Sequence, residues 1–402
     1  MAIHFVADVH VGNHRRFGGG LISGVNLRAA ETLDVLKEAV RIANKSGDTL
    51  VVLGDLCDTP RPTPQLLRAI GNALTPDASM SGPIVLLVGN HDRVSMAEND
   101  HALAPLDWIE GVRVVEKPSV MSVEASSIMN EQHLVLVPHN PAPAKEWLAQ
   151  TVAELDPPKG GLLCIHLGVE DENTPWFLQG AADSIHVDIL RELIDDHELA
   201  GVFAGNWHDR RVWEGPNGEP IVQVGALVPT GFDNPGLEGY GSVAHWHDSN
   251  QPTLAGRMSV PSSGVDFTEI EGPRFVTCKT VDALEKVLAA STTETEGVVV
   301  PPFNPRIGDV PSWVRAKYVT QSPTLLEGEA EVEHLRDSFY ELVVEVAAQN
   351  MEAAATNAAE GVKQGKCFDE VLAEYVENMD LGELAPEVLA TVRGYLNESK
   401  TN

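Results

Sequence analysis

The chain has 402 residues, 43% hydrophobic and 22% charged, a composition typical of a globular protein with a sizeable core and two or three domains. Its formal net charge of −31 argues against loose electrostatic adhesion to nucleic acid or to anionic membranes, but a phosphate-containing substrate held through cations stays open. The sequence shows no apolar run of about 18 residues, no signal peptide and no paired cysteine motif, which predicts a cytoplasmic protein without a membrane span.

Short apolar runs rich in Val, Ile and Leu recur over the first 250 residues. Each is too short for a typical helix and ends in a turn or in polar residues, so each predicts a buried strand. The runs are Ile3–Ala7, Leu50–Leu53, Ile84–Val88, Leu134–Val137, Leu162–Ile165 and Val202–Ala204. Two further runs, Ile221–Val224 and Ser242–Trp246, predict later strands of the same unit.

Helical patterns lie between several of these strands. Apolar residues recur at helical spacing from Leu27 to Ala43, and Gly47 is expected to end that helix. Further helices are predicted at Pro64–Leu74, Ala144–Leu155 and Val187–Leu199. Strands that alternate with helices predict an α/β layered domain, in which polar residues at the carboxyl ends of strands form the active site.

The composition changes after Gly239, and the segment Ser249–Gly264, rich in Ser, Pro and Gly, predicts a boundary. Strands at Arg274–Lys279 and Trp313–Thr320, with a helix at Val281–Ala290 and a long helix from about Glu327, predict a small α/β domain. We therefore expect a first domain over residues 1–255, a small α/β domain over 256–350 and a helical region over 351–402.

The C-terminal region is acidic. Residues 327–402 hold 5 Lys and Arg and 17 Asp and Glu, a net charge of 5 − 17 = −12, which makes a poor nucleic-acid surface. Two helical patterns, Phe368–Asn378 and Pro386–Leu396, present apolar residues that can pack on their own domain or on a partner protein.

Five short motifs occur in order, each just after a predicted strand. They are Asp8-Val9-His10, Gly54-Asp55-Leu56-Cys57-Asp58, Gly89-Asn90-His91-Asp92, His166 and Gly205-Asn206-Trp207-His208. Carboxylate, amide and imidazole ligands together suit Mn, Fe or Zn better than Ca. Asp55 is the natural bridge between two cations, which at about 3.5–4 Å apart can clamp a phosphoryl group and activate a water.

The spacings within the motifs fit this chemistry. Gly54 and Gly89 allow the backbone to turn close to a metal, where most side chains would obstruct it. Asn90 can ligate through its amide oxygen while His91 faces the substrate as a general acid or a charge stabiliser. Asp58 can orient His91 or a water, or can cap a helix. Any one motif alone could be a turn, a cap or a core histidine; the ordered set at strand ends predicts a phosphoesterase.

The ordered set resembles the calcineurin-like metallophosphoesterase superfamily, whose pattern is D-x-H, G-D-x-x-D, G-N-H-D/E, H and G-H-x-H, over about residues 1–250. The resemblance implies a β-sandwich flanked by helices, with a dinuclear metal site at one edge. It implies one metal held by Asp8, His10, Asp55 and His208, a second held by Asp55, Asn90, His166 and Asn206, and His91 as the catalytic histidine. Asn206 departs from the pattern, which has a histidine there, and amide oxygen is the weaker ligand for borderline metals.

Other polar side chains have less context. Arg15 and Arg16 lie in the Gly-rich loop Gly12–Gly24, just after the first ligands. They can touch a substrate phosphate or belong to a solvated loop. His139 follows the strand Leu134–Val137 and can lie near the site or serve the structure.

The order of domains resembles SbcD-type DNA repair exonucleases of bacteria or phages, in which a small domain caps the site and a helical tail docks on an SbcC-like ATPase. This resemblance implies a Mn-dependent DNA exonuclease or endonuclease, with an ATPase partner or a homodimer as expected assemblies. Two alternatives stay open. One is a phosphodiesterase or phosphatase acting on small nucleotides or phosphoproteins, which the negative charge favours. The other is a catalytically weak scaffold subunit, suggested by Asn206.

Overall fold

The computed structural model describes residues 2–14, 21–75, 82–124, 131–175, 178–229, 241–247, 264–270, 272–278, 296–299 and 314–319. The chain divides into two compact units, Met1–Gly272 and Pro273–Asn402. The predicted α/β fold class is confirmed in the first unit by two mixed sheets with helices on their outer faces. The finer division into domains 1–255, 256–350 and 351–402 stays a prediction.

The first sheet has six strands built from the apolar runs nearest the N-terminus. In spatial order they are β16 (Val265–Glu269), β15 (Ser242–His247), β1 (Ala2–Val6), β4 (Thr49–Val52), β5 (Ile84–Leu87) and β6 (Val112–Val115). Strands β1, β4, β5 and β6 run parallel, and β15 and β16 are antiparallel to their neighbours. All residues of β1, β4 and β5 are buried, as expected of parallel strands covered on both faces.

The second sheet also has six strands. In spatial order they are β13 (Arg211–Glu214), β14 (Pro220–Gln223), β12 (Gly201–Gly205), β9 (Leu162–His166), β8 (Glu131–Val137) and β7 (Ser119–Glu124). Its four inner strands are parallel, and β13 and β7 are antiparallel edges. Two small ribbons complete the unit, the hairpin of β2 (Leu21–Ile22) and β3 (Val25–Asn26) and the parallel pair of β10 (Gly168–Glu170) and β11 (Ser184–His186). One 3₁₀ helix, η1, spans Ala104–Trp108.

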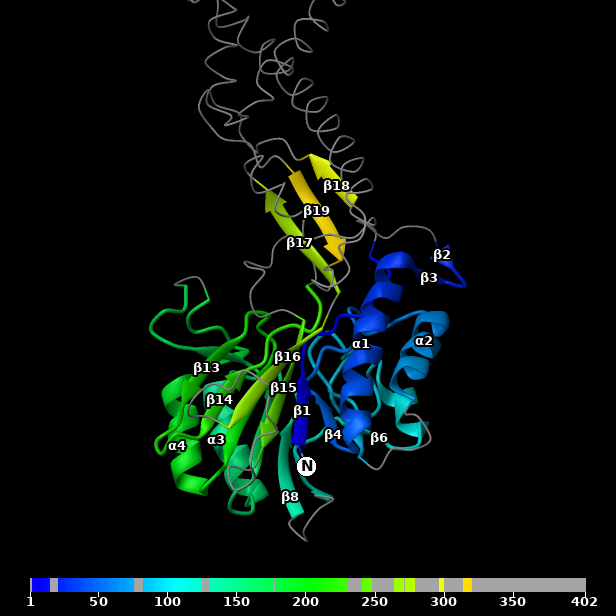
Figure 1. Cartoon of the computed structure of the whole chain (residues 1–402). Helices are drawn as coiled ribbons and strands as arrows, with labels where there is room; N and C mark the ends of the chain where they lie inside the picture. Colours follow the sequence, from blue (N-terminus) through cyan, green and yellow to red (C-terminus); the bar gives the residue numbers. More distant parts are fainter. Residues whose placement is uncertain are drawn as a thin grey trace, which may run out of the picture. The chain divides into compact units, whose positions relative to one another are not determined.

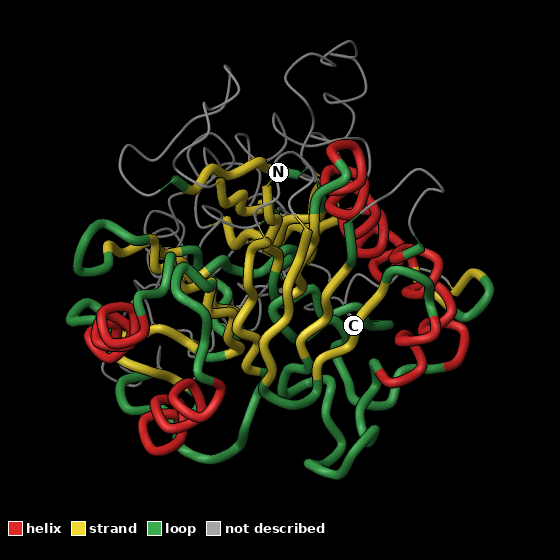
Figure 2. The backbone as a smooth tube through the Cα atoms, turned by 90° about the horizontal axis from the view of Figure 1, so that it is seen from below, coloured by secondary structure: helices red, strands yellow, loops and turns green. Residues whose placement is uncertain are grey.

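Helices cover the outer face of each sheet (Figures 1 and 2). The first sheet carries α1 (Leu27–Ser46) and α2 (Pro64–Leu74), and the second carries α3 (Ala144–Leu155) and α4 (Val187–His197). Local sequence fixes their ends. The Asn26 side chain accepts the Ala29 N–H at the start of α1, and Gly47 closes that helix at φ 68°. Thr63 caps α2 just before Pro64.

The two sheets pack face to face through a single apolar cluster that includes Phe5, Leu53, Leu87, Cys164 and Phe203. Phe5 of β1 stacks on Phe203 of β12, with ring centroids 3.8 Å apart and an interplanar angle of 8°. The strands of both sheets are thereby held in one stack. Because β1 and β12 each lead into one of the predicted motifs, this contact also fixes how the two halves of the site meet.

Sequence periodicity predicted most of the buried elements, but it missed the short, largely buried pair β10 and β11 and the strands at the sheet edges. The eight predicted strands of the first unit and its four helices are present, with α2 and α3 at the predicted bounds. Edge strands β6, β7, β13 and β16 were not predicted. In the second unit, β17 (Pro273–Cys278), β18 (Glu296–Val299) and β19 (Val314–Val319) form an antiparallel sheet in the order β17-β19-β18. The strands predicted at 274–279 and 313–320 match β17 and β19.

The helices predicted at Val281–Ala290, after Glu327, at Phe368–Asn378 and at Pro386–Leu396 lie outside the described residues. Among the helices that the structure describes, none combines the length and apolar character needed to cross a bilayer.

We predict that Phe203→Ala lowers the free energy of unfolding by about 3–5 kcal/mol, because it empties the stack between the two sheets. Urea denaturation followed by circular dichroism measures the change. Trp108→Ala is the matched control, since the Trp108 side chain is 87% exposed and its loss should change stability by less than about 0.5 kcal/mol. Similar losses for both variants would mean that the inter-sheet stack does not hold the sandwich together.

Candidate metal centre

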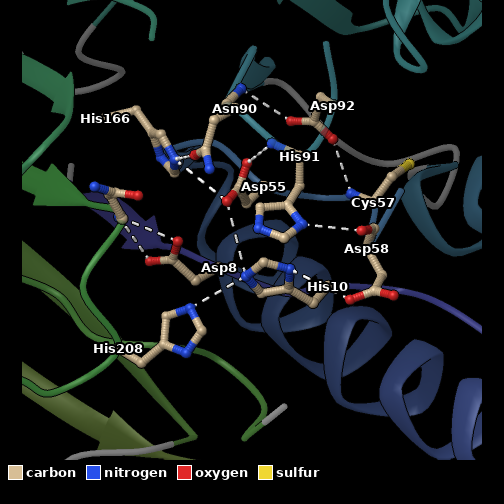
Figure 3. Close-up of polar contacts among 12 residues, drawn as sticks. Asp8, His10, Asp55, Cys57, Asp58, Asn90, His91, Asp92, His166 and His208 are labelled. Carbon is tan, nitrogen blue, oxygen red and sulfur yellow. Dashed lines mark hydrogen bonds and ion pairs between the residues drawn. The ribbon is translucent and has the colours of Figure 1, made fainter. Parts of the chain in front are cut away.

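The predicted ligands gather where the strands of the two sheets end (Figure 3). The segments after β1 and β4 stay side by side, because Asp8 N–H donates to Gly54 O at 3.2 Å and His10 N–H donates to Asp55 O at 3.0 Å. From the other sheet, β9 ends on His166, and β12 ends just before Asn206. Loops from both sheets therefore converge on one edge, as the sequence predicted.

Four of the predicted ligands have left-handed backbone conformations, with φ of 50° at Asp8, 48° at His10, 51° at Asp55 and 89° at Asn206. Asp and Asn tolerate this region better than most residues because their short side chains can bond locally. Such conformations cost free energy and persist where the surrounding structure enforces them, which is common at functional sites. Four such conformations at one edge indicate that the surrounding structure holds the backbone there in the form that places these side chains.

Two glycines give the side chains room. A Cβ on Gly54, which has φ 99°, would lie 2.2 Å from His166 Nδ1. A Cβ on Gly89 would lie 2.1 Å from Asp55 Oδ1 and 2.4 Å from the Asp55 backbone nitrogen. Position 54 requires glycine because its φ is positive and because a Cβ would clash with His166. Position 89 requires glycine because a Cβ would clash with Asp55.

Asp8 is a fully buried carboxylate at the centre of the site. Both of its oxygens accept the Asn206 backbone N–H, at 3.1 and 3.0 Å. Burial raises the pKa of Asp8 to about 6 and the nearby Asp55 carboxylate adds to the rise, while His166 and His208 oppose it. A buried carboxylate in this setting needs a positive partner to stay ionised.

His166 has one ring nitrogen committed to the protein and one turned to the site. Its Nδ1 donates to Leu53 O at 2.6 Å. Its Nε2 faces two acceptor oxygens, Asn90 Oδ1 at 2.8 Å and Asp55 Oδ2 at 3.4 Å. Burial lowers the pKa of His166, but the Asp55 and Asp8 carboxylates outweigh burial and raise it to about 9 without a cation. Either a proton or a metal ion must hold these three atoms together.

Asp55 lies between the histidines. Burial alone would raise the pKa of its carboxyl group, but His166, His10 and His91 outweigh burial and hold that pKa well below its usual range. Its Oδ2 lies 3.8 Å from His10 Nε2 and 3.4 Å from His166 Nε2. A carboxylate so placed between two sets of imidazoles is the natural bridging ligand for two cations.

His10 and His208 face each other with their Nε2 atoms 3.2 Å apart. Burial lowers the pKa of His10 to about 3, so this imidazole is neutral and can offer a lone pair. Its Nδ1 is buried without a hydrogen-bond partner and lies 3.7 Å from Asp58 Oδ1. Two imidazole nitrogens that converge in this way are suited to a transition-metal ion.

Three groups of residues each bring three possible ligand atoms together, and within each group these atoms lie within 4.8 Å of one another. They are Asp8, His10 and His208; His10, Asp55 and His91; and Asp8, Asp55 and His166. The groups share Asp8, His10 and Asp55, as expected of adjacent ions. The facing imidazole nitrogens and the oxygens around His166 Nε2 lie close enough to share a cation in place of a proton. The residues therefore fit a cluster of divalent cations.

His91 differs from the other histidines because it is exposed. Its backbone N–H donates to Asp55 Oδ1 at 2.8 Å, and its Nδ1 donates to the backbone carbonyl of Asp58 at 3.0 Å. The helix-capping role considered for Asp58 is wrong, because α2 begins at Pro64 with Thr63 as its cap. Asp58 positions His91 through its carbonyl, and its carboxylate lies between His10 and His14, at 3.7 and 3.8 Å.

The structure gives roles to two residues for which the sequence indicated none, Asp92 and Asp183. Asp92, wholly buried, accepts the Cys57 N–H at 2.9 Å and the Gly89 N–H at 3.0 Å, and so ties the loops after β4 and β5 together. Asp183 accepts from the side chain of Asn206. His139 lies beside His166, with ring centroids 6.3 Å apart. Arg15 and Arg16, predicted to bind substrate, lie outside the described residues.

We predict that Gly89→Ala lowers the affinity for Mn²⁺ by about tenfold or more, because the added Cβ displaces the Asp55 carboxylate and no side-chain rotation relieves the clash with its backbone nitrogen. Gly71→Ala on α2 is the control, since its Cβ would meet only side-chain atoms, Ile109 Cδ1 at 3.4 Å and Leu106 Cδ2 at 3.8 Å. Calorimetric titration should show unchanged Mn²⁺ binding for Gly71→Ala. Wild-type affinity in Gly89→Ala would remove Asp55 from the centre.

Comparison with known proteins gives a family match and distant structural likenesses. A family model described as "Calcineurin-like phosphoesterase" matches residues 1–210. Among solved structures, an archaeal phosphodiesterase is 13% identical, with 61% of this chain and 93% of that chain covered and a TM-score of 0.30. A dimetal phosphatase from Danio rerio is 13% identical, with 56% and 87% covered and a TM-score of 0.33. A putative 5'-nucleotidase from Staphylococcus aureus is 12% identical, with 61% and 50% covered and a TM-score of 0.36. No curated protein matches the chain.

Proposed function

The chain belongs to the calcineurin-like phosphoesterase family, and on that premise we propose that it is a Mn²⁺-dependent DNA nuclease of the SbcD type. It is a metal-dependent phosphoester hydrolase, and the family uses a dinuclear metal centre. The proposal rests on the convergence of buried Asp and His donors with the half-buried Asn90, Asn206 and His208, beside His91, the one exposed histidine among the described residues.

The site residues divide into proposed metal ligands and one side chain, His91, that faces the substrate. We assign Asp8, His10, Asp55 and His208 to one ion and Asp55, Asn90, His166 and Asn206 to the other. Two bound divalent cations clamp a phosphoryl group and lower the pKa of water. The oxygen ligands Asp8, Asp55, Asn90 and Asn206 favour Mn²⁺, with Fe²⁺ or Zn²⁺ as alternatives.

His91 performs the proton transfer in this account. Asp58 O holds its Nδ1–H, so Nε2 is the ring atom available to a substrate. In the protonated ring, Nε2 gives its proton to the leaving oxygen as the phosphorus–oxygen bond breaks. The hydrogen bond from the His91 backbone N–H to Asp55 Oδ1 holds this residue beside the proposed metal ligands.

Support for DNA as the substrate comes from the second unit of the chain. Residues Pro273–Asn402 contain the antiparallel sheet β17-β19-β18, at the place in the sequence where SbcD-type enzymes carry a small domain. We extend the proposal to partners: the acidic region after Met351 binds an SbcC-like ATPase, or a second copy of the chain, in the cytoplasm. These assignments rest on the sequence resemblance.

A specific observation favours a second candidate, a phosphodiesterase or phosphatase for small nucleotides or phosphoproteins. Three of the described arginines near the motif loops are already engaged by the protein. Arg211 Nε lies 2.5 Å from Asp209 Oδ2, and Arg93 Nη2 donates to the Glu116 carbonyl at 2.6 Å. The guanidinium carbon of Arg210 lies 4.5 Å from the centre of the Phe267 ring. With a net charge of −31, the chain then relies on its metals more than on its arginines to attract phosphate.

We predict that Asp55→Asn and His91→Ala fail in different ways. Asp55→Asn weakens an anionic ligand shared by two cations, so metal content and turnover should fall together and excess Mn²⁺ should recover part of the loss. His91→Ala should keep its metal while turnover falls by about 10²–10⁴-fold. Metal analysis and steady-state hydrolysis of a phosphodiester measure both quantities.

The leaving group separates the possible roles of His91. A nitrophenolate needs little protonation, so the deficit of His91→Ala should shrink on a nitrophenyl ester if His91 is the general acid. An equal deficit on both esters would assign it to charge stabilisation instead. Loss of metal in His91→Ala would make this residue a ligand, as its place beside His10 and Asp55 permits.

We predict that, with Mn²⁺, the protein degrades linear duplex or single-stranded DNA faster than it hydrolyses cyclic nucleotides. A panel of these substrates with bis-nitrophenyl phosphate measures the preference. Hydrolysis of cyclic nucleotides without DNA cleavage would favour the small-nucleotide enzyme. Two bound Mn²⁺ ions with no hydrolysis of any substrate would favour the weak scaffold subunit.

A further inference from the structure

Asn206 poses a chemical problem that a histidine at the same position would not. The two ends of an asparagine amide differ, since the oxygen offers lone pairs to a cation and the nitrogen presents only hydrogens. Rotation about the last side-chain bond exchanges the two ends. Asn206 is therefore a useful ligand only if something in the protein fixes which end faces the metals.

Asp183 makes the contacts that fix it. The Nδ2 atom of Asn206 donates to the backbone carbonyl of Asp183 and to its Oδ2, each at 3.1 Å. Both partners are oxygens that only accept, so the chemistry of the contacts requires the nitrogen end of the amide there. The carbonyl oxygen of Asn206 is then the end turned away from Asp183.

The backbone of Asn206 is held as firmly as its amide. Its N–H donates to both oxygens of Asp8, at 3.1 and 3.0 Å, and its φ is 89°. The next residue, Trp207, packs on Gly168, where a Cβ would lie 2.3 Å from the indole ring. Gly168 N–H donates to the same Asp183 carbonyl at 3.0 Å. Residues 183, 168 and 206 thus form one connected support.

We propose that Asp183 is a positioning residue that makes Asn206 a carbonyl-oxygen ligand of the second cation. This inference rests on the proposed dinuclear centre. Asp183 acts on the centre through Asn206, in the way that outer carboxylates orient metal-bound histidines. An oxygen in place of an imidazole nitrogen shifts the preference of the second site towards Mn²⁺ or Mg²⁺ and away from Zn²⁺.

Asp183 has a second possible influence, since its negative charge can attract a cation without any contact through Asn206. The Asp183 charge already acts on His139, which lies beside the site. Burial lowers the pKa of His139 to about 4, and the Asp183 carboxylate opposes that shift. A variant that removes the charge and keeps an acceptor oxygen separates the two influences. Asp183→Asn is that variant. Asp183→Ala removes the charge and the side-chain contact with Asn206, and it leaves only the backbone carbonyl contact.

The test is Mn²⁺ titration calorimetry, with electron paramagnetic resonance to detect the coupled pair of ions. Asp183→Ala should weaken one of two sites by about tenfold or more and leave the other unchanged. Asp183→Asn should keep most of the wild-type affinity. In the Asn206→Ala background, Asp183→Ala should have no further effect, because its route to the metal is gone.

Three results overturn the inference alone. They are wild-type affinity in Asp183→Ala, an equal loss in Asp183→Asn, and an undiminished effect of Asp183→Ala in the Asn206→Ala background. A wild-type protein that binds fewer than two Mn²⁺ ions would overturn the dinuclear centre as well. Circular dichroism and thermal unfolding of each variant show whether a lost site reflects lost structure.

Discussion

The site is governed by two carboxylates buried in the same small volume. Asp8 and Asp55 are 0% and 2% exposed, and both lie within 4.8 Å of one nitrogen of His166 and of each other. Ionised groups of like sign are costly to bury unless positive charge compensates them. The protein supplies imidazoles that can take a proton or share a metal, but only cations neutralise both carboxylates and also accept the lone pairs of His10 and His208.

The sandwich brings these groups together at a cost to the backbone. The predicted ligands follow the ends of strands in both sheets, and the Phe5–Phe203 stack holds the two sheets against each other. Placing four of them requires left-handed backbone at Asp8, His10, Asp55 and Asn206. The inter-sheet core can sustain this strain because it contains Ala7 and Leu53, which adjoin Asp8 and the Gly54–Asp55 turn in the chain. His91 is exposed at this edge, and we propose that it is the ring that meets a substrate.

Much of the fold and the site could be predicted from residue patterns. Strands β1, β4 and β5 are buried on both faces and so appear as mainly apolar runs, and each site motif follows such a run. Edge strands β6, β7 and β13 mix polar and half-buried residues, and their pattern does not distinguish them from loops. Asp183 could not be predicted, because it meets Asn206 across 23 residues of chain and belongs to no motif. The backbone role of Asp58 was equally hidden, since any residue has a carbonyl.

The most direct test of the account is an anomalous difference map, recorded at the manganese absorption edge, from crystals grown with Mn²⁺. The account predicts two peaks about 3.5–4 Å apart, with Asp55 between them and His91 outside the coordination of both. A single peak, or two peaks elsewhere in the chain, would contradict the claim that the buried carboxylates exist to hold a pair of ions.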